Sequence, residues 1–122
     1  AWVGEAGRIL RPGGRLVFLT NSPLSAMCVP AEGGPAGVRL LRGPGELREI
    51  RWPGGGVEHH PGHGEWIRVL TGHGFVVEGL RELHAPPDHD PGRAAVDFYD
   101  IADLAWARRW PAEDLWSARL QG

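Results

Sequence analysis

Histidine and glutamate side chains gather in a short stretch rich in glycine and proline, which contains His59, His60, His63 and Glu65. Zinc can bind imidazole and carboxylate ligands at short spacing. No cysteine accompanies this group and no second ligand pair with suitable spacing is evident, so the sequence predicts no metal site. A histidine that titrates near neutral pH can accept a proton from an oxygen or nitrogen nucleophile. We therefore expect His60 and His63 to be the catalytic candidates and the other side chains of the group to be solvated.

A second candidate site follows the apolar segment Arg15–Thr20, where Thr20, Asn21 and Ser22 stand in succession. Ligands of open parallel sheets sit outside the carboxyl ends of the strands, so these three residues are expected to face a substrate. A capped turn is the alternative, because asparagine and serine are favoured there as well. Trp52, near the tip of an expected hairpin, is expected to cover the substrate.

The elements that position these residues alternate between helix and strand. Residues 2–10 predict an amphipathic helix, which the turn Pro12-Gly13-Gly14 ends. The apolar run that follows, Arg15–Thr20, is typical of a strand buried on both faces in a parallel sheet flanked by helices. The helix places its apolar residues on one face: Trp2, Val3, Ala6, Ile9 and Leu10.

The rest of the chain continues this α/β pattern. We expect a loop over 21–46 with a helical turn at Leu24–Cys28, and a β-hairpin whose strands, 47–52 and 57–59, flank a glycine-rich turn. A helix over 65–73 is expected to bury Trp66, Ile67 and Leu70 and to lead into a strand over 75–83. The last expected elements are a loop over 84–99, a helix over 101–109 capped by Asp100 with Asp103 in the capping box, and a strand over 115–120.

Three segments, in this order, carry a resemblance to a known family. Glu5–Val17 contains Arg-Ile-Leu-Arg-Pro-Gly-Gly before a strand, and Leu70–Phe75 has the spacing L-x-x-x-G-F between a helix and a strand. Trp106–Trp116 leads into the final strand. Together they resemble the C-terminal half of class I, Rossmann-like S-adenosylmethionine-dependent methyltransferases. Within that family, the sequence is similar to that of an actinomycete-type subgroup. The resemblance spans nearly the whole chain.

The resemblance implies a fold and a cofactor. The fold is α/β: a partial Rossmann-like methyltransferase sheet of the fifth strand and the antiparallel sixth and seventh strands, with flanking helices and an inserted β-hairpin. The seventh strand lies between the other two. S-adenosylmethionine is the implied methyl donor, but the family holds it mainly through residues that precede this half, so no cofactor-binding residue is assigned here. The glycines Gly54–Gly56 do not open a helix, as a phosphate-binding loop would, and fit a hairpin turn better.

A parallel strand needs a neighbour, which we expect upstream of Ala1. Residues 1–122 are therefore expected to form a single C-terminal portion of a methyltransferase domain without its cofactor-binding half. The expected function is S-adenosylmethionine-dependent methyl transfer to a small-molecule acceptor, in which this chain supplies the substrate side and the sheet edge. The alternative is a catalytically inactive remnant or pairing module that self-associates through an exposed sheet edge.

Composition narrows the partners and the compartment. The net charge of the 122-residue chain is −2, which argues against nucleic acid or a membrane surface as a partner held by bulk charge. No apolar run reaches the roughly 20 residues of a membrane-spanning helix. The single cysteine, Cys28, fits a reducing cytoplasm and is expected to be chemically inert.

Overall fold

The computed structural model describes residues 2–85, 102 and 104–121. The described elements alternate between helices and strands along most of the chain, as the sequence predicts for an α/β fold. In chain order they are α1 (Trp2–Ile9), β1 (Arg15–Asn21), α2 (Pro23–Cys28), the 3₁₀ helix η1 (Pro44–Arg48), β2 (Ile50–Arg51), β3 (Val57–Glu58), α3 (His63–Gly72), β4 (Phe75–Leu83), α4 (Leu104–Arg109) and β5 (Glu113–Leu120).

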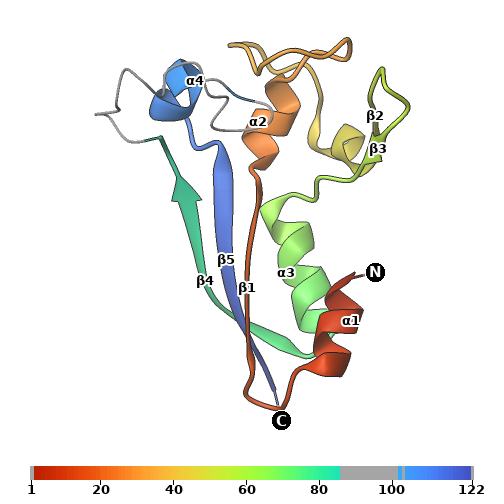
Figure 1. The fold of residues 1–122 in the computed structure, drawn as a ribbon, viewed down its shortest axis with the longest axis vertical. Coiled ribbons are helices and arrows are strands. Elements are labelled where there is room, and N and C mark those ends of the chain that lie inside the picture. The colour runs from red at the N-terminus through yellow and green to blue at the C-terminus, as the bar shows by residue number, and fades with distance from the viewer. Residues whose placement is uncertain (1, 86–101, 103, 122) are drawn as a thin grey trace.

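The three long strands form one sheet in the order β1-β5-β4 (Figure 1). The last strand, β5, pairs antiparallel with both neighbours, so β1 and β4 run parallel to each other. Their carboxyl ends therefore lie at the same end of the sheet, where β5 begins. A β-bulge in β4 between Val77 and Gly79 shifts the pairing by one residue.

One face of this sheet is covered by α1 and α3. Phe18 of β1 and Trp116 of β5 lie on that face with their rings nearly parallel, 6.3 Å apart, and Trp66 of α3 packs against both. Val3 of α1 and Leu70 of α3 complete the buried centre of this cluster, in which Trp116 is fully buried. Burial of large aromatic side chains is the main stabilising contribution here.

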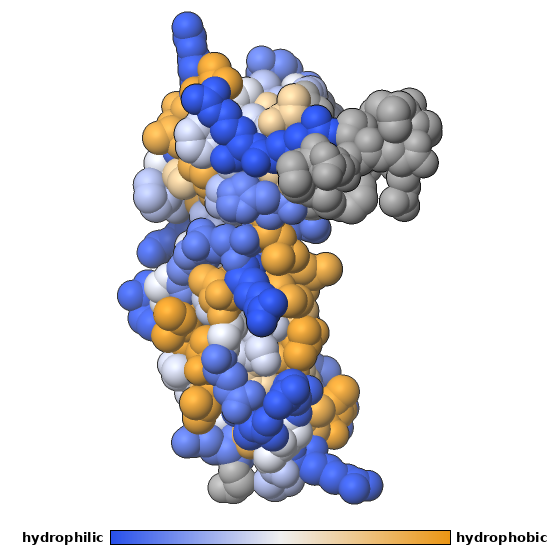
Figure 2. Space-filling model, turned by 90° about the vertical axis from the view of Figure 1, so that its left-hand side faces the viewer, coloured by the Kyte–Doolittle hydropathy of each residue, from blue (hydrophilic) through white to orange (hydrophobic). Residues whose placement is uncertain are grey.

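The opposite face of the sheet corrects the expectation that β1 is buried on both faces. Val17 and Leu19 alternate with Phe18 and are 53% and 57% exposed. The pairing register places Val76 on the same face, and it is exposed as well. Figure 2 shows this side of the molecule, where apolar side chains lie among charged ones. The reason is that the helices packed on the sheet, α1 and α3, both lie on the side of Phe18 (Figure 1).

Helical geometry corrects two further expectations. In α3, Trp66 and Leu70 are buried one turn apart, whereas Ile67 lies about 100° around the axis from Trp66 and is 43% exposed. In α1, Val3 is buried but Ile9, in the last turn, is 68% exposed. The helix α3 also begins at His63 rather than at residue 65, because Gly62 is its N-cap.

Beyond the sheet, the expected hairpin is present but short. β2 and β3 pair antiparallel over two residues each, and Gly55 takes a positive φ of 89° in the turn. Leu47, expected in the first strand of the hairpin, is buried in η1 instead. Of the loop expected over 84–99, all but the first two residues lie outside the described part of the chain, as do the expected capping residues Asp100 and Asp103. None of the helices in the described part of the chain has both the length and the apolar character to cross a membrane.

Ser22 joins the end of β1 to the start of α2. It is the N-cap of α2: its Oγ accepts a hydrogen bond from the Ser25 backbone N–H and donates one to the carbonyl of Pro111, 2.7 Å away. Ser25 Oγ reaches the carbonyl of Ala112, so both serines tie α2 to the segment that leads into β5. Both side chains are buried, and their hydroxyls are therefore committed to structural hydrogen bonds.

Trp116→Ala should lower the free energy of unfolding by about 3–5 kcal/mol, because it leaves a cavity at the centre of the aromatic cluster. Urea denaturation followed by far-UV circular dichroism measures this change. Trp110, which is 38% exposed, is the matched control, and Trp110→Ala should cost less than about 1.5 kcal/mol. Equal losses for the two variants would contradict the proposed core.

Ser22→Ala should lower the free energy of unfolding by about 1–2 kcal/mol, because it removes an N-cap and leaves buried backbone groups without a partner. The same denaturation assay measures it. Asn21→Ala, at the preceding and less buried position, should change the free energy by less than about 0.5 kcal/mol. A neutral Ser22→Ala variant would show that the hydroxyl is not part of the fold.

Candidate functional site

Polar side chains meet at the end of the sheet where β1 and β4 end and β5 begins. The pairing register aligns Thr20 of β1, Asp114 of β5 and Glu82 of β4 side by side across the three strands. Directly paired residues of adjacent strands project to the same face of a sheet. His63, the first residue of α3, reaches this group from the helix that covers that face.

His63 and Asp114 form the closest polar contact of this group. His63 Nε2 lies 2.7 Å from Asp114 Oδ2, a hydrogen bond in which the imidazole donates to the carboxylate. The His63 side chain is 36% exposed and that of Asp114 is fully buried. The His63 ring also contacts Trp116 edge to face, with the centroids 5.8 Å apart. Asp114 and Trp116 thus fix the position of the imidazole ring. The hydrogen bond to Asp114 uses Nε2 and not Nδ1.

A fully buried aspartate such as Asp114 is unusual near the start of the central strand of a sheet. Burial raises the pKa of its carboxyl group, and the charge of Glu82 acts in the same direction, although the hydrogen bond from His63 opposes both effects. One carboxyl oxygen, Oδ1, is buried without a hydrogen-bond partner in the structure. A buried oxygen that lacks a partner is costly, so the position calls for a functional explanation.

A pocket of about 290 Å³ adjoins His63. Ser22, His63 and Glu82 supply its polar groups, while α2 and η1 supply apolar walls. Two sequence-predicted site residues, Ser22 and His63, thus come together here. The hydroxyl of Ser22 is engaged in capping α2, whereas His63 and Glu82 retain exposed surface.

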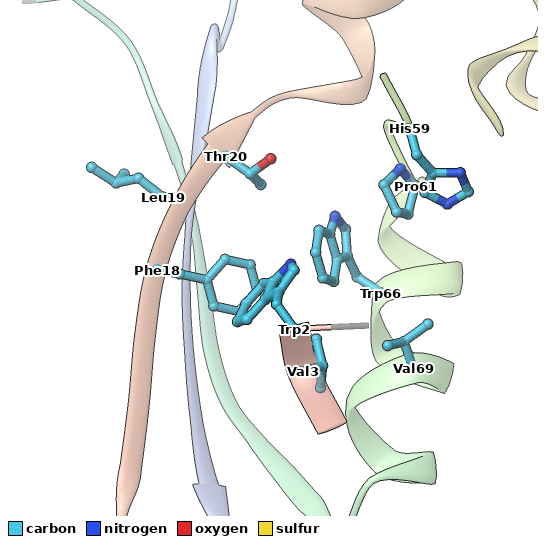
Figure 3. Close-up of a pocket in the computed structure, with 9 residues that line it drawn as sticks. All are labelled: Trp2, Val3, Phe18, Leu19, Thr20, His59, Pro61, Trp66 and Val69. Atoms are coloured by element: carbon cyan, nitrogen blue, oxygen red, sulfur yellow. The ribbon is translucent and has the colours of Figure 1, made fainter. Parts of the chain in front are cut away.

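A larger, open pocket of about 540 Å³ lies between β1, α1 and α3 (Figure 3). The rings of Trp2, Phe18 and Trp66 point toward one another along its wall, while Leu19 points to the opposite side of β1 (Figure 3). Phe18 lies edge to face against Trp2 at 4.9 Å. Thr20, a predicted substrate-binding residue, contributes a hydroxyl to this mostly aromatic pocket (Figure 3).

The other predicted site residues lie apart from these two pockets. His60 is buried, and its Nε2 lies 2.9 Å from Glu58 Oε2. Burial raises the pKa of Glu58, but the hydrogen bonds from His60 and Trp52 prevail and lower it overall. Trp52 packs between two apolar clusters, with the Arg42 guanidinium 5.3 Å from the centre of its ring. His60 and Trp52 are thus held by contacts outside the two pockets, and Asn21 is half-buried at the end of β1.

Two further features bear on chemistry elsewhere in the chain. His59, expected to be solvated, is exposed, with Nδ1 2.6 Å from the carbonyl of Arg48, and it borders the aromatic pocket. Cys28 is buried, and burial raises the pKa of its thiol, which reduces the reactive thiolate form. In the described residues, the Gly54–Gly56 segment is a hairpin turn and does not open a helix that could cradle a nucleotide.

Sequence reasoning missed Asp114 and Glu82. The sequence pattern predicts a final strand that begins at residue 115 and therefore excludes Asp114, but β5 begins at Glu113. The alternation Asp114, Trp116, Ala118 follows the period of a strand and was the available signal, because it places the carboxylate on the same face as the buried indole. No comparable sequence signal marks Glu82, whose position depends on the pairing of β4 with β5.

Comparison with known proteins gives matches among solved structures. No family model matches the chain, and no curated protein matches it. The structure is similar to an S-adenosylmethionine-dependent methyltransferase from Mesorhizobium loti, with 26% sequence identity and a TM-score of 0.60 over 96% of this chain and 52% of that chain. It is also similar to a proposed S-adenosylmethionine-dependent methyltransferase from Listeria monocytogenes, with 17% identity and a TM-score of 0.58 over 98% of this chain and 54% of that chain.

The chain spans about half the length of these two solved structures. Nearly the whole of it aligns, including the sheet in which the last strand lies between the two earlier long strands. The chain therefore has a fold that is shared, over about half of their length, with S-adenosylmethionine-dependent methyltransferases.

Proposed function

We propose that the chain takes part in S-adenosylmethionine-dependent methyl transfer to a small-molecule acceptor, as the C-terminal half of a class I methyltransferase domain. The observation that carries the proposal is the β1-β5-β4 sheet together with its similarity to two solved structures of this kind. In this assignment β1 corresponds to the fifth strand of the family, β4 to the sixth and β5 to the seventh.

In this proposal, residues other than those described here bind the cofactor. The described residues lack a glycine-rich loop that leads from a strand into a helix, so we assign no cofactor contact to them. A second polypeptide segment would pair with β1, which is an edge strand of the described sheet, and would cover the exposed side chains of Val17 and Leu19. S-adenosylmethionine, when bound there, would supply an activated methyl group.

The acceptor side is the carboxyl end of the sheet. Thr20 and Asn21 are placed there by β1, and Ser22 shapes the adjoining wall. Of the two expected catalytic histidines we favour His63, because Asp114 orients its ring and the side chain is partly exposed beside a pocket. His63 Nδ1 would accept the proton that the acceptor oxygen or nitrogen loses as it is methylated, while the hydrogen bond to Asp114 stabilises the resulting imidazolium.

Isothermal titration calorimetry tests the assignment. S-adenosylmethionine is titrated into the chain alone and into the chain produced together with a polypeptide that carries the cofactor-binding half of a class I methyltransferase domain. We expect saturable binding only in the second case, with transfer of radiolabelled methyl groups to members of a panel of small phenols, carboxylates and amines. Absence of binding and transfer in both cases would contradict the proposal.

In the active preparation, His63→Gln should lower kcat by about a hundredfold without changing the affinity for S-adenosylmethionine, because a general base contributes to the chemical step. His73→Gln is the control, since His73 lies at the C-terminal end of α3 with Nδ1 against the carbonyl of Val69.

A pairing module without activity is the second candidate, and the exposed edge of β1 favours it. An unpaired strand edge beside exposed Val17 and Leu19 is suited to association with another copy of the chain.

This candidate predicts a concentration-dependent dimer in light scattering coupled to size exclusion. Leu19→Lys should convert the dimer to monomer, whereas Ile9→Lys, at an apolar position on α1 that is even more exposed, should not. A wild-type chain that stays monomeric at every concentration would exclude the pairing module.

A further inference from the structure

We propose that His63, Glu82 and Asp114 form a binding site for a divalent transition-metal ion such as zinc. Three elements supply the ligands: the start of α3, the end of β4 and the start of β5. One ligand atom from each residue lies within 4.8 Å of those of the other two. The sequence did not predict this site, because its members are far apart in the chain.

The electrostatics of the group are unfavourable without a cation. Asp114 and Glu82 are directly paired across β5 and β4, and like charges in such a pair destabilise a sheet. Asp114 is fully buried, and its Oδ1 has no hydrogen-bond partner, although Oδ2 bonds to His63. A bound cation would neutralise the paired carboxylates and provide a partner for the buried oxygen.

The donor set indicates the class of ion. One imidazole and two carboxylates suit zinc or a similar transition metal, whereas magnesium and calcium favour oxygen ligands alone. Tetrahedral ligands at about 2.0–2.2 Å from zinc lie about 3.3–3.6 Å apart. The ligand atoms of the three residues lie within 4.8 Å of one another, so inward side-chain movements of up to about 1.5 Å would close the group. Three protein ligands leave a coordination position free for a water molecule or a substrate.

Access to the site comes from the pocket of about 290 Å³ that His63 and Glu82 border. The neighbouring histidines are engaged elsewhere: His59 lies against the carbonyl of Arg48, and His60 lies against Glu58. Of the three neighbouring histidines, only His63 contacts the buried carboxylate of Asp114.

This inference rests on side-chain geometry and does not depend on methyl transfer. With a metal bound, His63 would be a ligand and could not also accept a proton, so the two proposals assign different states to one imidazole. Metal binding to the chain can be measured without any activity assay, and the failure of either proposal is therefore visible separately.

Zinc binding to the untagged, chelator-treated chain tests the site by isothermal titration calorimetry. We expect one zinc ion per chain, and a rise in Tm of at least about 5 °C at a hundredfold excess of zinc over Kd. Glu82→Gln and His63→Gln should each weaken binding at least tenfold. Glu82 is exposed, so its replacement should leave the circular dichroism spectrum unchanged.

Glu78→Gln is the matched control, because Glu78 lies on the same strand but pairs with Arg119 through its Oε2 at 3.0 Å. It should bind zinc as the wild type does. The proposal is overturned if the chain shows no saturable zinc binding. It is equally overturned if both Glu82→Gln and His63→Gln bind with wild-type affinity, since zinc would then occupy other histidines.

Discussion

The antiparallel pairing of β5 with both β1 and β4 is the constraint on which the rest of the structure depends. It fixes the two parallel strands on either side of one central strand, so that their carboxyl ends coincide. The same register places Trp116 between Phe18 and Leu80, and Asp114 between Thr20 and Glu82. A slip of one residue would turn Trp116 toward the exposed face and remove the carboxylate from His63.

The aromatic core and the polar site lie next to each other on the same face of the sheet. Trp116 lies two residues from Asp114 on β5, and His63 contacts both side chains. Packing of Trp66 from α3 against Trp116 holds the helix on the sheet, and the beginning of that helix carries the imidazole. The position of His63 therefore depends on hydrophobic packing one turn farther along the helix. The opposite face of the sheet, with Val17 and Leu19, takes no part in this arrangement and is exposed.

Local sequence patterns predicted where the helices and strands lie better than they predicted which of their side chains are buried. The apolar run that forms β1, the turn that ends α1 and the step from α3 into β4 depend on neighbouring residues, and each is found near its expected bounds. Exposure depends on what packs against an element from far away in the chain. For this reason the patterns did not distinguish partly buried Leu16 from exposed Val17, or buried Trp66 from exposed Ile67. Asp114 and Glu82 meet only through strand pairing, which no local pattern encodes.

The pairing of β5 with both neighbouring strands is tested most directly by nuclear Overhauser effects between strands in the isotope-labelled chain. We expect cross-strand contacts from Trp116 to both Phe18 and Leu80, and from Asp114 to both Thr20 and Glu82. Direct backbone contacts between β1 and β4, or a register displaced by one residue, would contradict this pairing.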